Sequence, residues 1–576
     1  MFRLWALGFA VSLGASPLAA AEQPLQLSVY ATAGDVRHYL GTASGREKTL
    51  EVVQRLGVSR LFLEGRRGDE YVSPEALAEV RDFFTARKMR AAGGIATVPG
   101  RTFGQRQNGG LDWLNWEDPK TRRDLAGFFT ENAPLFSELI VDDFFCTADT
   151  SPASERARGE RTWGAYRRDL LVSLVGPSLT EPAQAARPGA RLIVKFPQWY
   201  DRFHLFGYDP PRMAAQFDQV WVGTEVRDPQ TQRMGFVQPT EGYMNFCWLA
   251  SIGGDKVVGA WFDHIECSAQ DFVNQAYGSV LAGARELTLF HLGDLMAGHP
   301  GDALLARRWP QLGELARRVR GQRREGIAFY KPPHSDADEN FYLMDYLGMI
   351  GLPIVPVAQY PESARVAFLG AQAAADLEIG RRVERHLRRG ATLVFTPAFV
   401  RRAGQWASRL AGVEVGPASV PASAAEARAG QTAIPLPAQL EVDASLRASE
   451  SQVVITAGVA GQPLPLLTTR RSGKGRILVL NVRTFAEQDF RDVGEWLLAP
   501  KRRGLPEIPQ ALADRLREPL LEPIGLRFEA PAGVALYLFA RGRCLYNFRA
   551  EPVVARINGK RLELAPNQCL WQGSGN

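Results

Sequence analysis

Residues 138–145 read Glu-Leu-Ile-Val-Asp-Asp-Phe-Phe, a short apolar run that ends in two adjacent acids. Such a run is typical of a buried parallel strand, and helical patterns flank it at 121–129 and 166–186. Seven similar runs lie at 25–31, 59–64, 90–97, 191–197, 219–225, 256–263 and 286–291. Eight strands, each followed by a helical pattern, within about 300 residues predict a (β/α)8 TIM barrel.

Beyond residue 320 the alternation restarts. Further apolar runs lie at 326–330, 354–357, 365–369, 392–395 and 477–481, with helical patterns between several of them, as in an open α/β sheet. From about residue 522 the runs alternate as in antiparallel strands, and Asn558-Gly559 predicts a hairpin turn. We therefore expect a barrel over 22–322, a flavodoxin/amidotransferase-like α/β domain over 323–505 and a small C-terminal β domain over 506–576.

The composition and the N-terminus restrict the class of protein. A net charge of +6 with 23% charged residues, and no basic block with interleaved aromatics, argue against nucleic-acid binding. Residues 1–21 predict a signal peptide, because one Arg precedes an apolar stretch that is too short to span a membrane and that ends in Ala19-Ala20-Ala21. We expect a secreted or periplasmic protein without stable membrane insertion after cleavage. Its five cysteines could form one or two disulfide bridges and leave at least one thiol over.

Acids gather at the ends of the predicted strands, where barrel enzymes have their active sites. These acids are Glu64, Asp142, Asp143, Glu225 and Asp263, with Glu266 and Asp294 in the segments that follow. Some could cap the next helix instead. Asp142 and Asp143, however, lie between apolar residues with no helix start nearby, which indicates a functional role.

The domain order resembles that of family 42 β-galactosidases and related barrel glycoside hydrolases: a barrel, an amidotransferase- or flavodoxin-like domain and a C-terminal β domain. The resemblance covers nearly the whole mature chain, and it is one of domain order rather than of sequence motif. Those enzymes carry an Asn-Glu pair at the end of strand four, where this chain has Asp142-Asp143. The resemblance implies glycoside hydrolysis, leaves the substrate open and implies a homo-oligomer, because the second domain of those enzymes supports oligomer formation.

Glycoside hydrolysis requires two carboxyl groups at the anomeric carbon, one to donate a proton and one to act as nucleophile or base. Strand periodicity lets only one of Asp142 and Asp143 point into the barrel mouth, and turns the other toward a neighbouring strand. Either Glu225 or Asp263 is well placed as the partner. We expect an acid/base mechanism with retention, although the decisive separation is a distance that sequence does not supply.

Other residues at the strand ends are candidates for substrate binding. Lys195 interrupts an apolar strand, and pairing with Asp142 or Asp143 would offset the cost of burying its ammonium. Trp199, Tyr200 and Trp261 could stack on sugar rings or belong to the core. The remaining candidates are Tyr30, Glu64, Arg227, Tyr243, His264, Glu266, His291 and Asp294.

Two alternatives compete with a metal-independent glycosidase. His264 and His291 together with the Asp pair could bind a metal ion, although HExxH and HxxxH spacings are missing from the sequence. A non-catalytic carbohydrate-binding barrel is the other alternative. The second domain is expected to be structural, since no cysteine between Cys267 and Cys544 could act as an amidotransferase nucleophile. No nucleotide-binding glycine motif is placed between a strand and a helix, so we expect no cofactor.

Overall fold

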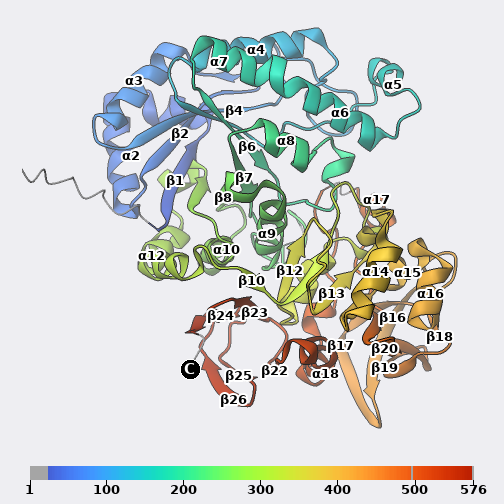
Figure 1. Ribbon diagram of the computed structural model, residues 1–576. Helices are drawn as coiled ribbons and strands as arrows, with labels where there is room; N and C mark the ends of the chain where they lie inside the picture. Colours follow the sequence, from blue (N-terminus) through green and yellow to red (C-terminus); the bar gives the residue numbers. More distant parts are fainter. Residues whose placement is uncertain (1–23, 232, 495–496, 574–576) are drawn as a thin grey trace, which may run out of the picture.

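The computed structural model describes residues 24–231, 233–494 and 497–573. The predicted signal peptide at 1–21 lies outside the described residues. Figure 1 shows a barrel in blue and green, an α/β domain in yellow and orange and a C-terminal β domain in red. Among the described residues, no helix combines the length and the apolar character needed to cross a bilayer.

The N-terminal part is a closed barrel of parallel strands, as the sequence predicts. The strands are β1 (Gln26–Ala31), β2 (Arg60–Arg67), β4 (Arg90–Ala96), β5 (Glu138–Val141), β6 (Arg191–Phe196), β7 (Gln219–Gly223), β8 (Val257–Asp263) and β9 (Glu286–Phe290). Each strand pairs in parallel with the next, and β1 pairs with both β9 and β2, which closes the barrel. The short β3 (Glu70–Tyr71) adds to β2 in the antiparallel direction.

Helices surround this barrel, and a capping side chain begins each of those named here except α9. They include α2 (Ala43–Leu56), α3 (Pro74–Thr85), α4 (Pro119–Asn132), α6 (Trp163–Val175), α8 (Pro210–Gln216), α9 (Glu241–Gly253), α10 (Ala269–Leu281) and α12 (Pro300–Val319). Ser73 caps α3 ahead of Pro74, and Ser268 forms a capping box with Asp271 at the start of α10. Long segments separate β4 from α4 (97–118) and β7 from α9 (224–240), so the carboxyl ends of the strands are followed by loops of very different length.

The barrel interior is filled by aromatic rings, and glycines make room for them. A Cβ atom at Gly259 would overlap the ring of Trp221, and one at Gly94 would lie 2.9 Å from the ring of Tyr30. Both rings are fully buried. The interior is therefore a packed core rather than a channel, and substrate access is limited to the ends of the strands.

The second domain has a parallel sheet in the order β12-β11-β13-β14-β21, the flavodoxin-like order. Its strands are β11 (Ile327–Tyr330), β12 (Ile354–Val357), β13 (Val366–Leu369), β14 (Thr392–Phe395) and β21 (Gly475–Leu480). The sheet continues in the antiparallel direction through β20 (Gln462–Ser472), β19 (Gln452–Val459), β16 (Pro421–Ala429) and β17 (Thr432–Asp443). The Ala-, Gly- and Pro-rich stretch at 416–436 thus contributes strands to this extension.

The C-terminal domain consists of two small antiparallel sheets and the helix α18 (Gln510–Leu521). The first sheet contains β10 (Arg324–Glu325), β23 (Val534–Phe539), β24 (Gly542–Asn547) and β27 (Cys569–Gly573). The second contains β22 (Phe528–Glu529), β25 (Val553–Ile557) and β26 (Lys560–Leu564). The predicted hairpin is confirmed: Asn558 and Gly559 have φ values of 49° and 81°, as a type I′ turn requires.

A buried ion-pair network closes the amino-terminal end of the barrel and gives a test of the fold. Arg60 donates to Glu286 at 2.9 and 3.0 Å and to Glu138 at 2.6 Å, and its side chain is 2% exposed. We expect Arg60→Leu to lower the free energy of unfolding by about 3 kcal/mol, because it removes a buried cation from two carboxylates. Denaturant unfolding measures this change.

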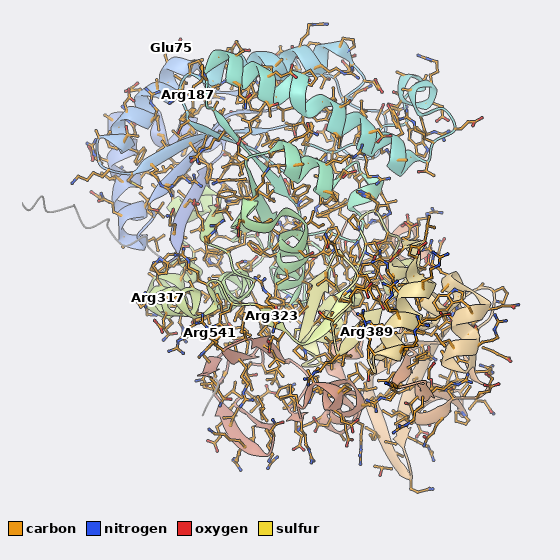
Figure 2. All side chains as sticks on the ribbon, in the orientation of Figure 1. Glu75, Arg187, Arg317, Arg323, Arg389 and Arg541 are labelled. Atoms are coloured by element: carbon orange, nitrogen blue, oxygen red, sulfur yellow. The ribbon has the colours of Figure 1, made fainter. Side chains whose placement is uncertain are left out.

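The matched control is Arg317→Leu on the outer surface of α12 (Figure 2). Arg317 is 58% exposed and pairs with Glu314 in solvent, so its loss should cost less than about 1 kcal/mol. Equal effects of the two substitutions would contradict the structural role of Arg60.

Candidate active site

The inward-facing positions of the barrel strands converge on one polar layer at their carboxyl ends. Ile140 and Ile193 lie in the barrel interior, so strand periodicity places Asp142 and Lys195, two residues later, on the same side. The layer contains Glu64, Asp142, Lys195, Glu225 and Asp263, with 4% of Glu225 exposed and less of the others. The strand-end acids that the sequence singles out therefore lie next to one another.

Lys195 lies at the centre of this layer. Its Nζ atom is 2.7 Å from Oδ2 of Asp143 and 2.6 Å from Oε1 of Glu225. Burial alone would lower the pKa of Lys195, but the two carboxylates raise it above its ordinary value. The ammonium is therefore charged, and the predicted pairing of Lys195 with an aspartate of the fourth barrel strand is confirmed.

Asp142 belongs to a second ion-pair group on the other side of the layer. Nη2 of Arg67 lies 2.8 Å from Oδ2 of Asp142 and 2.9 Å from Oε1 of Glu64. Glu64 also accepts hydrogen bonds from the Tyr30 hydroxyl at 2.6 Å and from the Ala33 backbone amide at 2.7 Å. Tyr30 and Glu64 thus help to hold Arg67 against Asp142.

Asp142 and Asp143 are sequence neighbours with opposite electrostatics. Burial raises the pKa of Asp142, but Arg67, Asp143 and Lys195 together bring it below its ordinary value. Burial also raises the pKa of Asp143, and Lys195 only partly offsets this effect, so with Asp142 and Glu225 nearby the pKa stays well above its ordinary range. Of the two, Asp143 therefore takes up a proton more readily than Asp142.

Glu225 faces Asp143 across the Lys195 ammonium. Burial raises its pKa, Lys195 lowers it and the charge of Asp263 raises it again, which leaves it above the ordinary value. Its Oε2 atom is buried, and within the described parts of the chain no hydrogen-bond partner reaches it. One oxygen atom of Glu225 is therefore left without a donor from the part of the chain that the structure describes.

Asp263 is fully paired with its neighbours. Arg227 donates to its Oδ2 atom at 2.6 Å and to its Oδ1 atom at 3.1 Å, and the Ile265 backbone amide donates to Oδ1 at 3.2 Å. The side chain of Asp263 is 2% exposed. This bidentate pair fixes the loop after β7 to the end of β8.

The aromatic candidates for sugar stacking lie in buried surroundings. Trp199 packs in a cluster with Trp113 and Phe206, with ring centroids 5.9 and 5.5 Å away. Tyr200 is completely buried and donates to Asp345 of the second domain at 2.8 Å. The ring of Trp261 lies inside the barrel, with the ammonium of Lys195 4.9 Å from its centroid.

The histidine candidates lie on different strands and have different partners. His264 pairs with Asp302 at 2.7 Å, and its ring stacks on that of Phe272. His291 pairs with Asp35 at 2.8 Å, and its other ring nitrogen lies 3.5 Å from Asp294. Hydrogen bonding to Asp35 overcomes the opposing effect of burial and raises the pKa of His291. Within the described residues, no group of three or more His, Cys, Asp or Glu side chains is arranged to hold a metal ion.

The last two candidates lie at the edge of this region. Glu266 accepts from the Thr231 hydroxyl at 2.7 Å and pairs with Arg233 at 3.0 Å. Tyr243 is buried on α9, and its ring lies 4.6 Å from that of Tyr537 in the C-terminal domain. Tyr243 therefore contributes to the contact between domains, whereas Glu266 holds the loop beyond β7.

Arg67, Phe144 and Phe290 are residues of the mouth that sequence reasoning missed. Arg67 lies three positions after Glu64, which in a regular strand would put it on the opposite face. A β-bulge between Glu64 and Arg66 shifts the register and brings Arg67 to the same side. Its guanidinium lies 5.9 Å from the ring centroid of Phe144 and 5.6 Å from that of Phe290, and both rings are partly exposed.

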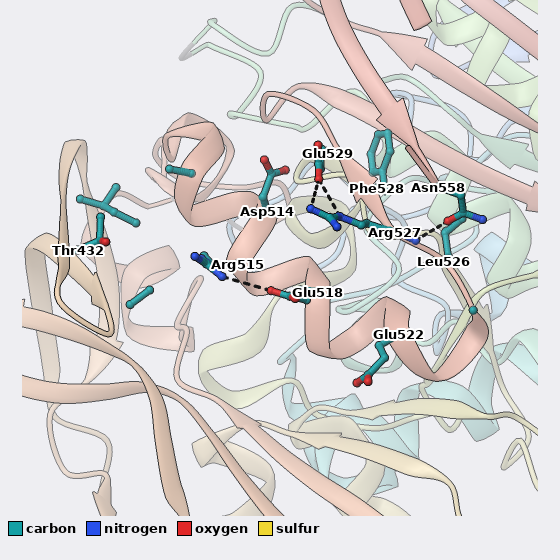
Figure 3. A pocket seen from close by; sticks show the side chains of 14 residues that line it. Thr432, Asp514, Arg515, Glu518, Glu522, Leu526, Arg527, Phe528, Glu529 and Asn558 are labelled. Atoms are coloured by element: carbon teal, nitrogen blue, oxygen red, sulfur yellow. Dashed lines mark hydrogen bonds and ion pairs between the residues drawn. The ribbon is translucent and has the colours of Figure 1, made fainter. Parts of the chain in front are cut away.

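A separate cavity of ≈ 650 Å³ lies outside the barrel. It is bordered by β16 and β17 of the second domain and by the C-terminal domain, including its helix α18 (Figure 3). The charged groups in its lining form ion pairs, among them Arg515 with Glu518 at 3.5 Å and Arg527 with Glu529 at 2.7 Å. Its lining residues run from 429 to 558 and include none of the strand-end acids. The barrel mouth therefore remains the candidate active site.

Comparison with known proteins identifies related sequences. Residues 15–313 match the family model described as "Probable glycosyl hydrolase, catalytic domain", and residues 323–425 match the second domain of an uncharacterized protein, SSO3021. That protein, from Saccharolobus solfataricus, is 25% identical over 368 residues, which are 57% of this chain and 59% of the relative. The match thus spans less than two thirds of the relative's length.

Solved structures share the fold at low identity. A β-galactosidase from Rahnella sp. R3 superposes with a TM-score of 0.66 at 11% identity and covers 96% of this chain and 98% of its own. Gan42B, a GH42 β-galactosidase from G. stearothermophilus, gives 0.63 at 11% and covers 96% and 98%. An α-L-fucosidase from Paenibacillus thiaminolyticus gives 0.61 at 11% and covers 94% and 91%. These likenesses show the fold alone.

The opposite electrostatics of Asp142 and Asp143 predict opposite effects of pH on stability. The pKa of Asp143 is raised in the folded protein, so folding is destabilised as the pH rises from the unfolded pKa through the folded pKa. Asparagine does not titrate, so Asp143→Asn lacks this destabilisation at high pH. The folded pKa of Asp142 is lowered, so its contribution is present above the unfolded pKa and disappears as the pH falls through the folded pKa.

Thermal midpoints measured from pH 3 to pH 8 test this difference. Relative to the parent protein, Asp143→Asn should become more stable as the pH rises, whereas the destabilisation by Asp142→Asn should shrink only below about pH 4. Parallel curves for the two variants would contradict the opposite pKa shifts of Asp142 and Asp143.

Proposed function

This chain belongs to the family of probable glycosyl hydrolase catalytic domains, and on that premise we propose that it hydrolyses glycosidic bonds of an oligo- or polysaccharide. The proposed mechanism uses Asp143 as proton donor and Glu225 as the second carboxylate. The observation that carries the proposal is the Lys195 ammonium, which contacts both groups at 2.7 and 2.6 Å. Two carboxyl groups that share one cation and have pKa values moved by burial are suited to acid/base chemistry.

The other acids of the layer are less available for the reaction. Both oxygens of Asp142 are occupied, one by Arg67 and one by the Asp143 backbone amide. Both oxygens of Asp263 accept from Arg227. In contrast, one oxygen of Glu225 has no hydrogen-bond partner among the described residues. The Asp143 side chain is 16% exposed, more than that of Asp142 or Asp263. We therefore assign positioning roles to Asp142 and Asp263.

The arrangement supports retention of configuration. One oxygen of Asp143 and one of Glu225 contact the same nitrogen atom, so these oxygens are no farther apart than the two contact distances together. Retaining glycosidases hold their carboxyl groups about 5 to 5.5 Å apart, whereas inverting enzymes leave about 6.5 to 9.5 Å for a water molecule. In the proposed reaction, Asp143 protonates the leaving oxygen while Glu225 attacks the anomeric carbon. Asp143 then takes a proton from a water molecule that attacks the same carbon and displaces the Glu225 carboxylate.

The proposed sugar-contacting surface is the partly exposed group around Arg67. The side chain of Arg67 is 25% exposed, and the Phe144 and Phe290 rings flank it. The apolar face of a sugar ring packs on such rings, while a guanidinium donates to sugar hydroxyls. His291, 27% exposed, adds a further polar group nearby. Export to the periplasm or beyond remains part of the proposal and rests on the sequence of residues 1–21.

Activity assays on the purified protein test the two-carboxylate mechanism. We expect Asp143→Asn and Glu225→Gln each to lower kcat/KM for release of reducing sugar by about 10²-fold or more, with EDTA present throughout. The assay uses a panel of bacterial and plant glycans, and NMR of the first product anomer reports retention. Glu75→Gln, a fully exposed acid on α3 (Figure 2), is the matched control that keeps full activity.

Three outcomes would overturn the proposal. Activity that requires a chelatable metal would indicate a metal-dependent carbohydrate hydrolase. Glycan binding by the parent protein without any turnover would indicate a carbohydrate-binding barrel. Full activity in both substituted proteins would remove Asp143 and Glu225 from the reaction.

The sugar-contacting surface predicts a separate change in substrate affinity. Phe144→Ala should raise KM about three- to tenfold and change kcat less, because the ring contributes contact area away from the reacting carboxyl groups. Phe83→Ala is the matched control: its ring is also partly exposed and packs on an arginine, Arg87, on the outside of the barrel. An unchanged KM in Phe144→Ala would exclude this ring from substrate binding.

A further inference from the structure

Two cysteines lie side by side in the C-terminal domain. Cys544 is on β24 and Cys569 is on β27, and the antiparallel register pairs Cys544 with Trp571 and Tyr546 with Cys569. The two cysteines therefore lie on the same face of the sheet, on neighbouring strands, with a diagonal offset of two residues. Their Sγ atoms are 3.0 Å apart.

We propose that Cys544 and Cys569 form a disulfide bond in the mature protein. A disulfide requires an S–S distance of about 2.05 Å, so the sulfurs must approach by roughly 1 Å. The remaining cysteines have other surroundings: Cys146 and Cys247 are buried, and Sγ of Cys267 lies 3.4 Å from the Ile265 carbonyl. The contact thus selects one pair from five thiols and leaves three unpaired.

The bond forms by thiol–disulfide exchange with an oxidised disulfide compound, such as oxidised glutathione or a disulfide-carrying oxidoreductase. Cys569 is partly exposed and borders a cavity of ≈ 430 Å³, whereas Cys544 is buried. The Cys569 thiolate attacks the oxidant and releases one reduced thiol. Cys544 then displaces the second thiol, so two protein thiols are oxidised, one disulfide of the oxidant is reduced and both protons pass to the departing thiolates.

The bond would fix the edge strand β27. β27 is at the edge of its sheet and pairs with β24 alone in the described sheet. An edge strand has a hydrogen-bonded neighbour on one side only, so it separates more readily than a strand inside the sheet. The same sheet contacts the barrel, because the Tyr546 hydroxyl donates to Asn274 of α10 at 2.6 Å and the Tyr546 ring lies 5.3 Å from that of Tyr277. The disulfide therefore reinforces the contact of the C-terminal domain with the barrel.

Peptide mapping of the full chain tests the proposal directly. The reduced protein is first equilibrated with an excess of oxidised glutathione. It is then unfolded in denaturant that contains iodoacetamide, which alkylates the free thiols, and digested without reductant. We expect a cross-linked Cys544–Cys569 peptide, lighter by two hydrogen atoms than its two thiol peptides, with Cys146, Cys247 and Cys267 alkylated. Cys267→Ser should keep this cross-link, whereas Cys569→Ser should abolish it and leave Cys544 alkylated.

A stability measurement provides the second readout. Reduction should lower the thermal midpoint of the parent protein by several degrees and leave that of Cys569→Ser unchanged. Five alkylated thiols after oxidation, glutathione adducts without a cross-link, or a cross-link to another cysteine would each overturn the proposal. None of these results bears on the glycosidase mechanism, because the strand-end carboxyl groups belong to the barrel.

Discussion

The buried ammonium of Lys195 is the constraint on which the candidate active site depends. A cation that is 2% exposed is costly unless carboxylates surround it, and Asp143 and Glu225 supply them. These residues come from three consecutive strands, β5, β6 and β7, which are adjacent in the barrel. The parallel register that closes the barrel therefore also brings together the two carboxyl groups that the proposed chemistry requires.

Two arginines each form an ion pair with one of the buried carboxylates in the site. Arg67 neutralises Asp142 on one side of the layer, and Arg227 neutralises Asp263 on the other. The central carboxyl groups share a single cation, so burial raises the pKa of Asp143 in particular. A fold selected for stability alone would avoid this excess of buried acid, and this imbalance supports the proposed role of the site.

Local patterns in the sequence predict most of the fold and part of the candidate site. Apolar runs of strand length locate the barrel strands, and the cost of a buried ammonium predicts that Lys195 pairs with an aspartate of the fourth barrel strand. The inward turn of Arg67 depends on a β-bulge, a register change that residue spacing does not reveal. The buried position of Tyr200 depends on Asp345 of the second domain, a contact 145 residues distant in the sequence.

The second domain contributes to the barrel mouth by fixing the loop after β6. Asp201 accepts a hydrogen bond from the Tyr342 backbone amide at 2.8 Å, and Tyr200 donates to Asp345 at 2.8 Å. Trp248 of α9 donates to the Lys331 carbonyl at 2.9 Å. Because this loop follows the strand that carries Lys195, its fixed conformation also restrains the position of the ammonium between the two carboxyl groups.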